Sequence, residues 1–574
     1  MTTTSSTTNS SGLTGTLNQT ASGRNYITGA ITGLDTNSLI QSAVNQRLTG
    51  YNQLETEIST NTSEISAYNY LQSYAQSLQT AISSLKSTTD SAGNTLTSKT
   101  GTFTTSDGST SSNLVTATVS ATALSGTHTL VVDKLATAMS VTSAAQSSTG
   151  TALGYTGTFD IALDGKTAAT ISVNPDMSLG DLQQAINNLS ATTGVSADIA
   201  QVGNGQYKLV LTGTSTNANI SVSNVTGDDV MQQLGVTASD GSFANVAQTA
   251  GQAQFSLDGT TIYSDSNTVS NVLTGVTLNL VNANPNTTLT MTVGSNTSGI
   301  STAINNFITA YNTLRNYIAS QQNVDTSTGT VSSSAVLFNE SIMRDFSHDV
   351  SGLLSTSYGS GTINSLGALG ISLDDNNNLE LSDSDTLNDA LTNNLSSIQQ
   401  LFATQFTSSS TNLTLAANSS NLNGTYTVAI TTDGNGNITG ASVNGDSNAF
   451  TIDGNQLVGK TGTAYAGLTL QYDGSSSANV QVTFSQGLGD ALYNTLDSYA
   501  NTDSGIIANR VDQLQTQNTD MTTQASQLYQ DAQDYQDQLI DKYSQMETAA
   551  LNAQLLKQQI DAILNGDSSS SSSS

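Results

Sequence analysis

Residues 507–539 read IANRVDQLQTQNTDMTTQASQLYQDAQDYQDQL, and small or apolar residues recur along them at alternating steps of four and three. This is the a/d spacing of a coiled-coil seam. The seam positions are Ile507, Val511, Leu514, Asn518, Met521, Ala525, Leu528, Ala532, Tyr535 and Leu539. After a stutter at Tyr543, the stripe continues through Met546, Ala550, Ala553 and Ile560. The spacing predicts a helix over 506–564, about 89 Å long at 1.5 Å per residue.

A second helical pattern runs from Asp35 to Ser87, and Asp35 or Thr36 is its expected N-cap. Its stripe consists of Val44, Leu48, Tyr51, Ile58 and Ile65 and, after a one-residue slip, of Leu71, Ala75, Leu78, Ile82 and Leu85. This helix is about 80 Å long. Because the two helices match in length, we expect an antiparallel coiled coil. The alternative is two unrelated amphipathic helices that pack on separate cores.

The C-terminal helix has two features that bear on its stability. Asn518 in the seam is expected to cost stability and to fix the register. Arg510, Lys542 and Lys557 are few cations among many Asp residues, so the helix lacks the charge pairs of a self-sufficient zipper. We expect it to be marginal alone and to be ordered by partners.

The composition narrows the class of protein, and a length of 574 residues predicts about three to five domains. Only 13 Lys and Arg oppose 43 Asp and Glu, a net charge of −30, which excludes a basic patch for nucleic acid or for an anionic membrane. The sequence has no cysteine and two histidines, which excludes disulfide scaffolds, thiol catalysis, Cys/His zinc sites and most general-base chemistry. No apolar run is long enough to span a bilayer, and residues 1–23 lack a signal peptide. We therefore expect a cytosolic protein or export by a route that reads no such signal.

The middle of the chain changes from β to helical patterns and back. The predicted fold class is multidomain α+β, with terminal helices forming an antiparallel coiled-coil leg, a helical leg domain, and β-rich outer domains. The expected domains are a disordered leader (1–27), the N-terminal coiled-coil leg (28–88), the leg domain in two parts (89–125 and 299–406), one or two outer α+β/β modules (126–298), an inserted β module (407–485), the C-terminal coiled-coil leg (486–565) and a disordered Ser tail (566–574).

Several short motifs invite a catalytic or metal-binding interpretation, and each is better explained as structure. Residues 433–437 (DGNGN) and 374–378 (DDNNN) lack the glycine and glutamate of a calcium loop and are predicted to be turns. Residues 83–86 fit S-x-x-K but lie within the helical stripe without companion motifs. His128 and His348 are single histidines, which are more often structural than catalytic. We therefore predict no enzyme, no cofactor and no metal.

Other segments carry a family resemblance. Residues 33–40 (GLDTNSLI), with Gly33, Leu34, Asp35 and Asn37, resemble the N-terminal signature of the flagellar hook-associated protein 2 family, the filament cap proteins. Residues 126–146 (GTHTLVVDKLATAMSVTSAAQ) resemble a short repeat motif of flagellin and hook-associated proteins. Further segments similar to the cap family are Phe307-x-x-x-Tyr311-Asn312, residues 366–371 (LGALGI), Leu379-x-Leu381, residues 395–402, and Gly505-Ile506-Ile507-x-x-Arg510.

The resemblance implies a structural assembly factor. Members form a ring of identical copies at the distal tip of the flagellum, outside the cell, after export through the flagellar type III channel. They retain exported flagellin and promote its folding and polymerisation, with helical legs reaching down to the newest subunits and outer β domains forming a plate. The implied partners are flagellin, the hook–filament junction proteins and an export chaperone, and the implied assembly face is the two helical stripes.

Two other functions remain open at the level of sequence. A flagellin-like filament or junction subunit shares terminal helices and a β middle, although residues 33–40 are cap-like. A surface adhesin is the other alternative, or an additional role, because Ser/Thr/Asn-rich β surfaces occur in proteins that bind host glycans or mucin.

Overall fold

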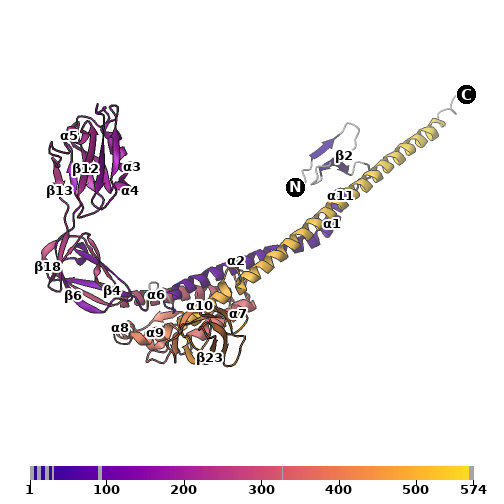
Figure 1. The fold of residues 1–574 in the computed structure, drawn as a ribbon. Helices are drawn as coiled ribbons and strands as arrows, with labels where there is room; N and C mark the ends of the chain where they lie inside the picture. The colour runs from indigo at the N-terminus through magenta and orange to yellow at the C-terminus, as the bar shows by residue number, and fades with distance from the viewer. Residues whose placement is uncertain are drawn as a thin grey trace. The chain divides into compact units, whose positions relative to one another are not determined.

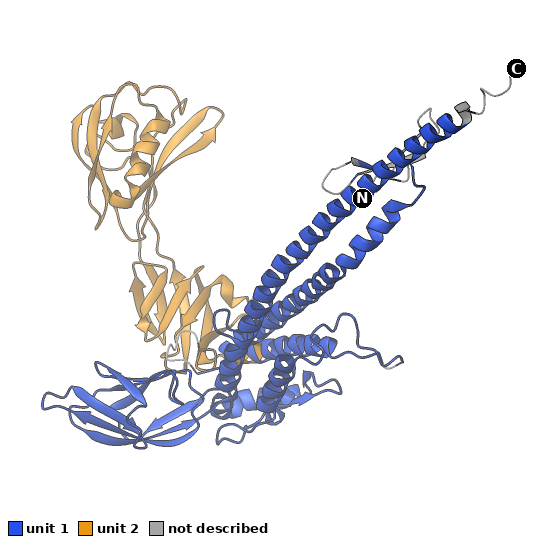
Figure 2. Ribbon diagram, turned by 90° about the vertical axis from the view of Figure 1, so that its right-hand side faces the viewer, with its two compact units in different colours: residues 1–87, 303–574 blue, residues 88–302 orange. Residues whose placement is uncertain are grey.

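The computed structural model describes residues 5–8, 14–19, 25–28, 31–87, 94–325 and 327–567 (Figure 1). The chain divides into two compact units (Figure 2). Unit 1 joins both ends of the chain, residues 1–87 and 303–574, and unit 2 is the continuous stretch 88–302.

The terminal helices of unit 1 lie side by side and run in opposite directions (Figure 1). Tyr51 meets Tyr529 and Thr62 meets Asn518, so rising residue numbers on one helix face falling numbers on the other. This confirms the predicted antiparallel pair and makes the alternative of two separate cores wrong. The helices are α1 (Thr36–Arg47), α2 (Thr49–Ser83) and α11 (Ile506–Asp567).

A helical body makes up the next part of unit 1. Its helices each bury one face, and Phe307, Phe346 and Phe402 are fully buried. The ring of Phe346 lies 4.9 Å from that of Tyr499, which joins two of these helices. The elements are α6 (Thr297–Gln321, in unit 1 from Ala303), α7 (Ser341–Leu354), the 3-10 turn η2 (Gly367–Leu369), β19 (Ile371–Leu373), β20 (Leu379–Leu381), α8 (Ser384–Asn393), α9 (Leu395–Phe402) and α10 (Leu488–Ala500).

A β sandwich is inserted into the helical body between α9 and α10. Two four-stranded antiparallel sheets, β21-β28-β23-β24 and β22-β27-β26-β25, share one core that includes Leu413, Val428, Leu470 and Phe484. Alternating burial along β28 shows why this polar stretch folds as strands, since every second side chain faces the core. The strands are β21 (Gln405–Ser408), β22 (Leu413–Asn418), β23 (Gly424–Thr432), β24 (Ile438–Val443), β25 (Phe450–Asp453), β26 (Gln456–Gly459), β27 (Leu468–Tyr472) and β28 (Ala478–Ser485).

Unit 2 contains two β-rich modules, each with its own core. The first packs a five-stranded sheet, β15-β14-β6-β18-β4, and a three-stranded sheet, β16-β17-β5, around Leu130, Phe255 and Met291. Its elements are β4 (Lys99–Thr105), the 3-10 turn η1 (Ser111–Asn113), β5 (Val115–Val119), β6 (Gly126–Lys134), β14 (Ala253–Leu257), β15 (Thr260–Ser264), β16 (Thr268–Leu273), β17 (Val276–Leu280) and β18 (Asn284–Ser295).

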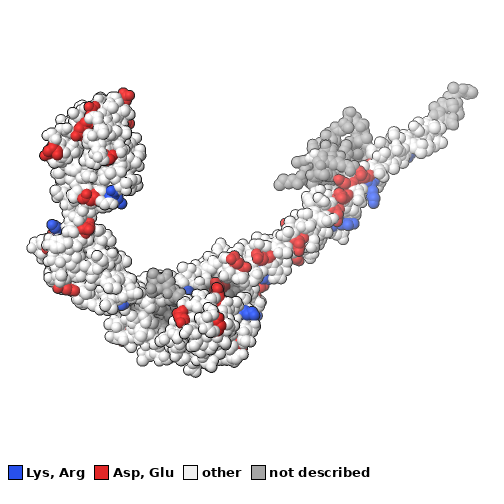
Figure 3. Space-filling model, viewed as in Figure 1, with Lys and Arg blue, Asp and Glu red and all other residues white. Residues whose placement is uncertain are grey.

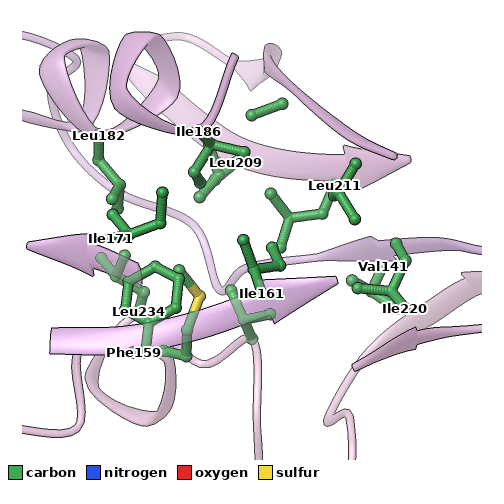
Figure 4. Packing of buried hydrophobic residues seen from close by; sticks show 14 of the residues in the cluster. Val141, Phe159, Ile161, Ile171, Leu182, Ile186, Leu209, Leu211, Ile220 and Leu234 are labelled. Carbon is green, nitrogen blue, oxygen red and sulfur yellow. The ribbon is translucent and has the colours of Figure 1, made fainter. Parts of the chain in front are cut away.

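The second module of unit 2 combines two sheets with a short amphipathic helix. Phe159, Ile161, Leu182 and Ile186 point into a common core (Figure 4). The strand orders are β10-β11-β7-β13 and β12-β8-β9. The elements are β7 (Ser140–Thr142), β8 (Gly157–Leu163), β9 (Ala169–Val173), α3 (Leu179–Asn188), α4 (Ser190–Thr193), β10 (Val195–Gly203), β11 (Gln206–Gly213), β12 (Ile220–Gly227), α5 (Val230–Gln233) and β13 (Val246–Gln248).

Two expected domain boundaries need correction. Residues 89–125 were predicted to open the helical leg domain, but β4 and β5 pair with β18 and β17 inside the first module of unit 2. The C-terminal leg was predicted to begin at 486, but α10 packs within the helical body and α11 starts only at Ile506. Residues 88–93 lie outside the described residues.

The leader of residues 1–27 was predicted to be disordered, yet its described residues form a three-stranded antiparallel sheet. The strands are β1 (Ser5–Thr8), β2 (Thr14–Gln19) and β3 (Asn25–Thr28). Tyr26 is buried against α1 and α11. The remaining leader residues and the Ser tail from 568 on lie outside the described residues.

Candidate assembly surface on the terminal helices

Both predicted stripes are buried at the base of the helix pair, where the end of the N-terminal stripe packs against α10: Gln76 donates to the Ala500 carbonyl and Gln79 to the Asp497 carboxylate. On α2 and just beyond it, Leu71, Leu78, Ile82 and Leu85 are fully buried. On α11, Ile507, Val511 and Leu514 are buried as well. Burial of seven such side chains stabilises this end strongly, since each fully buried large aliphatic side chain contributes about 1.5–3 kcal/mol.

The middle of the seam is more open and more polar. Half-buried side chains line it from both helices, namely Val44, Leu48, Tyr51, Ile58, Ile65, Asn518, Met521, Leu528, Tyr535 and Leu539. The rings of Tyr51 and Tyr529 contact each other at a tilt of 44°, with 5.3 Å between their centroids, and the Arg47 guanidinium lies 4.5 Å from the centroid of the Tyr535 ring. The predicted stripes therefore face each other, and most of their area is used for pairing within the chain.

Asn518 interrupts the apolar seam as expected. Its Nδ2 donates to the Thr62 hydroxyl over 3.3 Å. Its Oδ1 is buried and, within the described part of the chain, has no hydrogen-bond partner. A single polar contact at this level disfavours other registers, because sliding either helix would leave Asn518 against apolar side chains.

Arg510 of the family signature ties the seam to the helical body. Its guanidinium lies 3.6 Å from the Glu64 carboxylate of α2 and 3.9 Å from that of Glu340, the residue that precedes α7. The Tyr68 hydroxyl donates to Glu340 over 2.9 Å, and burial together with this bond raises the pKa of Tyr68. Burial and the nearby Glu340 charge raise the pKa of Glu64, while Arg510 lowers it. One cation thus holds two carboxylates from distant segments.

A junction below the seam was not anticipated from the sequence. Asp490 of α10 is 4% exposed, and its carboxylate accepts the Ser87 N–H (3.1 Å), the Ser87 hydroxyl (2.6 Å) and the Thr404 N–H (2.7 Å). Gly487 and Gly489 bring this turn against the Phe402 carbonyl, since a Cβ at either position would lie within 2.7 Å of that oxygen. The junction fixes together the end of the N-terminal leg and both ends of the β sandwich.

The N-terminal signature shapes the start of α1. Gly33 adopts a φ of +68°, which favours glycine. The Asp35 carboxylate caps α1 by accepting the Ser38 hydroxyl and the Ser38 N–H, and these bonds lower the pKa of Asp35. The Asn37 side chain accepts the Tyr26 hydroxyl over 2.9 Å, whereas Leu34 is half exposed.

The C-terminal signature shapes the start of α11. A Cβ on Gly505 would lie 2.5 Å from the Asn501 carbonyl, so only glycine fits this close turn. The Asn501 side chain accepts the N–H groups of Asp503 and Ser504 in the same turn. Ile506 is exposed, so this signature residue takes no part in the seam.

The far end of α11 differs from the seam. Its large apolar side chains are between 36% and 68% exposed, and we call them the tip stripe: Met546, Leu551, Leu555, Leu556, Ile560, Ile563 and Leu564. Charged side chains are sparse on this part of the helix (Figure 3). A row of exposed leucines and isoleucines on a helix is typical of a surface that is covered in an assembly.

The other sequence candidates are structural features. The carboxylates of Asp374 and Asp433 accept N–H groups of their own turns, which lowers the pKa of each. His128 Nδ1 lies 2.8 Å from the Asp258 carboxylate, and His348 is exposed on α7. Among the described residues no group of three or more His, Cys, Asp or Glu side chains could hold a metal, and no described helix is long and apolar enough to cross a membrane.

Family models match most of the chain. The flagellar hook-associated protein 2 C-terminus model matches residues 250–554, more than half of the sequence, and the corresponding N-terminus model matches residues 32–139. The chain belongs to the flagellar hook-associated protein 2 family. A third model, the flagellin hook IN motif, matches residues 156–217.

Individual relatives agree with this assignment. Flagellar hook-associated protein 2 of Escherichia coli K12 is 30% identical over 385 residues, which cover 65% of this chain and 79% of the relative. The B-type protein of Pseudomonas aeruginosa PAO1 is 27% identical over 289 residues, covering 48% and 60%. Among solved structures, the D1-D2-D3 domains of the flagellar cap protein FliD from Escherichia coli are 29% identical, with a TM-score of 0.45, and cover 59% of this chain and 90% of that one.

Membership of this family gives the chain the role of a flagellar filament cap. The family is a structural one that acts at the filament tip, in an oligomeric assembly associated with flagellin. The two alternatives, a flagellin-like subunit and an adhesin, are not favoured by the matches.

The position of the flagellin-type motif needs correction. It was predicted at residues 126–146, but the family model of the flagellin hook IN motif matches residues 156–217, from β8 to the loop after β11. Residues 126–134 form β6, a central strand of the other module, and their β-branched alternation is that of an antiparallel strand with one face on the core.

Proposed function

We propose that copies of this chain form a ring at the growing end of the flagellum, outside the cell, and there retain exported flagellin and promote its folding and polymerisation. In this proposal α1, α2 and α11 form a leg, and the tip stripe of α11 contacts the newest filament subunit. Flagellin, the hook–filament junction proteins and an export chaperone are the proposed partners.

The tip stripe carries the proposal. The seam residues are used for pairing within the chain, whereas the leucines and isoleucines of the tip stripe remain exposed on a helix that continues past α1. Axial filament subunits with helical ends offer apolar helical faces, and covering the tip stripe removes apolar surface from water at about 25 cal/mol per Å². Because the leg alone exposes this stripe, assembly is the step that stabilises it.

A paired substitution tests the proposal in a motile strain whose own cap protein has been deleted. Leu556→Asp with Ile560→Asp places two charges on the tip stripe and should leave the strain non-motile, with flagellin leaking into the medium. Gln554→Asp with Gln558→Asp adds the same charge on the opposite face of the same helical turns and should restore motility. Both variants must be recovered outside the cell in equal total amounts, with the medium and the filament fraction counted together, which separates export from capping.

Two results would contradict the proposal. Normal filaments with the Leu556/Ile560 variant would mean that the tip stripe does not contact the filament. Equal leakage from both variants would mean that added charge, and not the apolar face, disturbs capping.

A further inference from the structure

A cavity in the helical body has no role in the proposed function. It has a volume of about 300 Å³ and lies between α6, α7 and the β19–β20 hairpin. That volume corresponds to about ten water molecules, at the lower end of the range for small-ligand sites. Its apolar wall is formed by Leu354, Leu366, Ile371 and Leu379.

The cavity is built by segments that carry the family resemblance. From the segment 366–371, Leu366, Gly367 and Ile371 line one wall, and Tyr311 and Leu379 form part of two others. Asn312 Nδ2 donates to the Leu379 carbonyl over 2.8 Å, and the Leu379 N–H donates to Asn312 Oδ1 over 2.7 Å. The Tyr311 hydroxyl donates to the Asn377 carbonyl. An asparagine side chain thus pairs with the hairpin as a neighbouring strand would, which holds the walls in place.

Arg315 is the cationic group of the cavity. It is one of 13 Lys and Arg residues in a chain with 43 acidic ones, and it is half-buried. Over the described ranges the ion pairs are formed by His128 and Arg510, and none involves Arg315. Like most cations of the described chain, Arg315 has no carboxylate partner, and its guanidinium carries five donors.

Three polar side chains near Arg315 already have hydrogen-bond partners. Asp374, which like Arg315 acts electrostatically on Tyr311, accepts the N–H groups of Asn376 and Asn378 at 2.8 Å each. The Ser351 and Ser355 hydroxyls donate back to carbonyls of their own helix. Arg315 therefore supplies the positive charge of the cavity lining, with guanidinium donors that no carboxylate of the described residues accepts.

We propose that this cavity binds an aliphatic carboxylate, with the carboxylate on Arg315 and the hydrocarbon part against Leu366 and Ile371. A guanidinium binds a carboxylate through two parallel charge-assisted hydrogen bonds, and an apolar wall beside it selects an aliphatic tail. Two sources supply this chemistry: a free small carboxylate, or an acidic residue beside an aliphatic one on a neighbouring copy of the chain.

Titration of the full-length chain with 4-methylpentanoate tests the site. Isothermal titration calorimetry or ligand-observed NMR should show saturable binding of one molecule per chain. Arg315→Gln should weaken it by at least about tenfold, the effect of losing a charge-assisted bond pair. Arg344→Gln removes the same charge from an exposed position of α7 outside the cavity and should leave binding unchanged.

Two further measurements make the result specific. The uncharged analogue 4-methylpentanamide should bind at least about tenfold more weakly than the acid. Ser351→Leu narrows the cavity from an exposed position while keeping Arg315, and it should abolish binding without changing the melting temperature by more than a few degrees.

Sedimentation of the same samples distinguishes the two sources. If a neighbouring copy supplies the carboxylate, 4-methylpentanoate and Arg315→Gln should each weaken self-association. If the ligand is a free molecule, self-association should be unchanged by either. Four results would each overturn the proposal. The first two are absence of saturable binding and equal binding of acid and amide. The others are equal effects of Arg315→Gln and Arg344→Gln, and loss of self-association in Arg315→Gln when the unsubstituted chain does not bind 4-methylpentanoate.

Discussion

The two halves of α11 belong to one continuous helix but differ in what covers them. Leu514, near its start, is 1% exposed and packs in the seam, whereas Leu556, near its end, is 58% exposed. Both positions hold leucine on a Gln- and Asp-rich helix, so local sequence does not separate them. The difference shows that an apolar stripe on a long helix can serve two purposes in succession: pairing within the chain, then contact with a partner.

The same substitution in both halves gives the largest contrast. Leu514→Asp should lower the free energy of unfolding by about 4–5 kcal/mol, because it removes a packed leucine and buries an unpaired carboxylate. Leu556→Asp should change it by less than about 0.5 kcal/mol, as expected for an exposed site. Urea unfolding followed by circular dichroism measures both. Equal effects would mean that the two halves are equally covered in the isolated chain.

Substitution of Asp490 gives the next largest effect, and it tests whether the stability of the seam depends on the junction at its end. Asp490→Ala leaves the Ser87 and Thr404 N–H groups without their acceptor and should cost about 2–3 kcal/mol. Asp512→Ala removes an exposed carboxylate from α11 and should cost almost nothing. Differential scanning calorimetry compares the melting temperatures of the two variants. Similar melting temperatures would mean that the hydrogen bonds of Asp490 do not stabilise the fold.

Arg510 gives a smaller and pH-dependent effect. The folded chain holds the Glu64 proton to a higher pH than the unfolded chain does, so the contribution of Glu64 to stability is full below its unfolded pKa and is lost as the pH rises through the raised pKa. Arg510 lowers the pKa of Glu64 and therefore reduces this loss of stability. Arg510→Gln should therefore cost about 1 kcal/mol at about pH 7 and much less at about pH 4, where Glu64 with its raised pKa becomes protonated.

Lys542→Gln is the control for this measurement, because Lys542 is exposed on the same helix. It should have no comparable pH dependence. A loss of stability in Arg510→Gln that stays constant between the two pH values would mean that Arg510 acts through packing and not through its charge.

Asn518 gives the smallest effect, and its sign is the informative part. Asn518→Leu removes the buried Oδ1 that has no partner among the described residues, and the Thr62 hydroxyl keeps its bond to the Ile58 carbonyl. The variant should be more stable by about 0.5 kcal/mol. A lower melting temperature than that of the parent would show that Asn518 is a net stabilising contact.

The sequence predicted the parts of the fold that local periodicity encodes. The heptads of 507–539 predicted both α11 and its buried side, and Asp35, one of the two expected N-caps, is the cap of α1. Periodicity failed where strands depend on distant partners. β4 and β5 pair with strands about 160 to 190 residues later, as in Thr102 with Thr292, so nothing nearby marks them as part of unit 2.

The candidate site was predicted in part for the same reason. The seam residues could be identified, but their partners could not, since burial of Tyr26 against α11 depends on a long-range contact. Asp490 resembles any acidic residue in the sequence, although the flanking Gly487 and Gly489 are a signal of close backbone approach that could have been used. The break between α10 and α11 also had a signal, in the turn-forming residues 501–505 (NTDSG).

Hydrogen–deuterium exchange along α11 tests the division of this helix most directly. In the isolated chain, amides of residues 507–540 should be strongly protected, because opening them breaks the seam, while amides of residues 548–564 should exchange rapidly. Adding filaments that lack a cap should protect 548–564 and leave 507–540 almost unchanged. Equal protection of both halves in the isolated chain, or no gain of protection at 548–564 on filaments, would contradict the account.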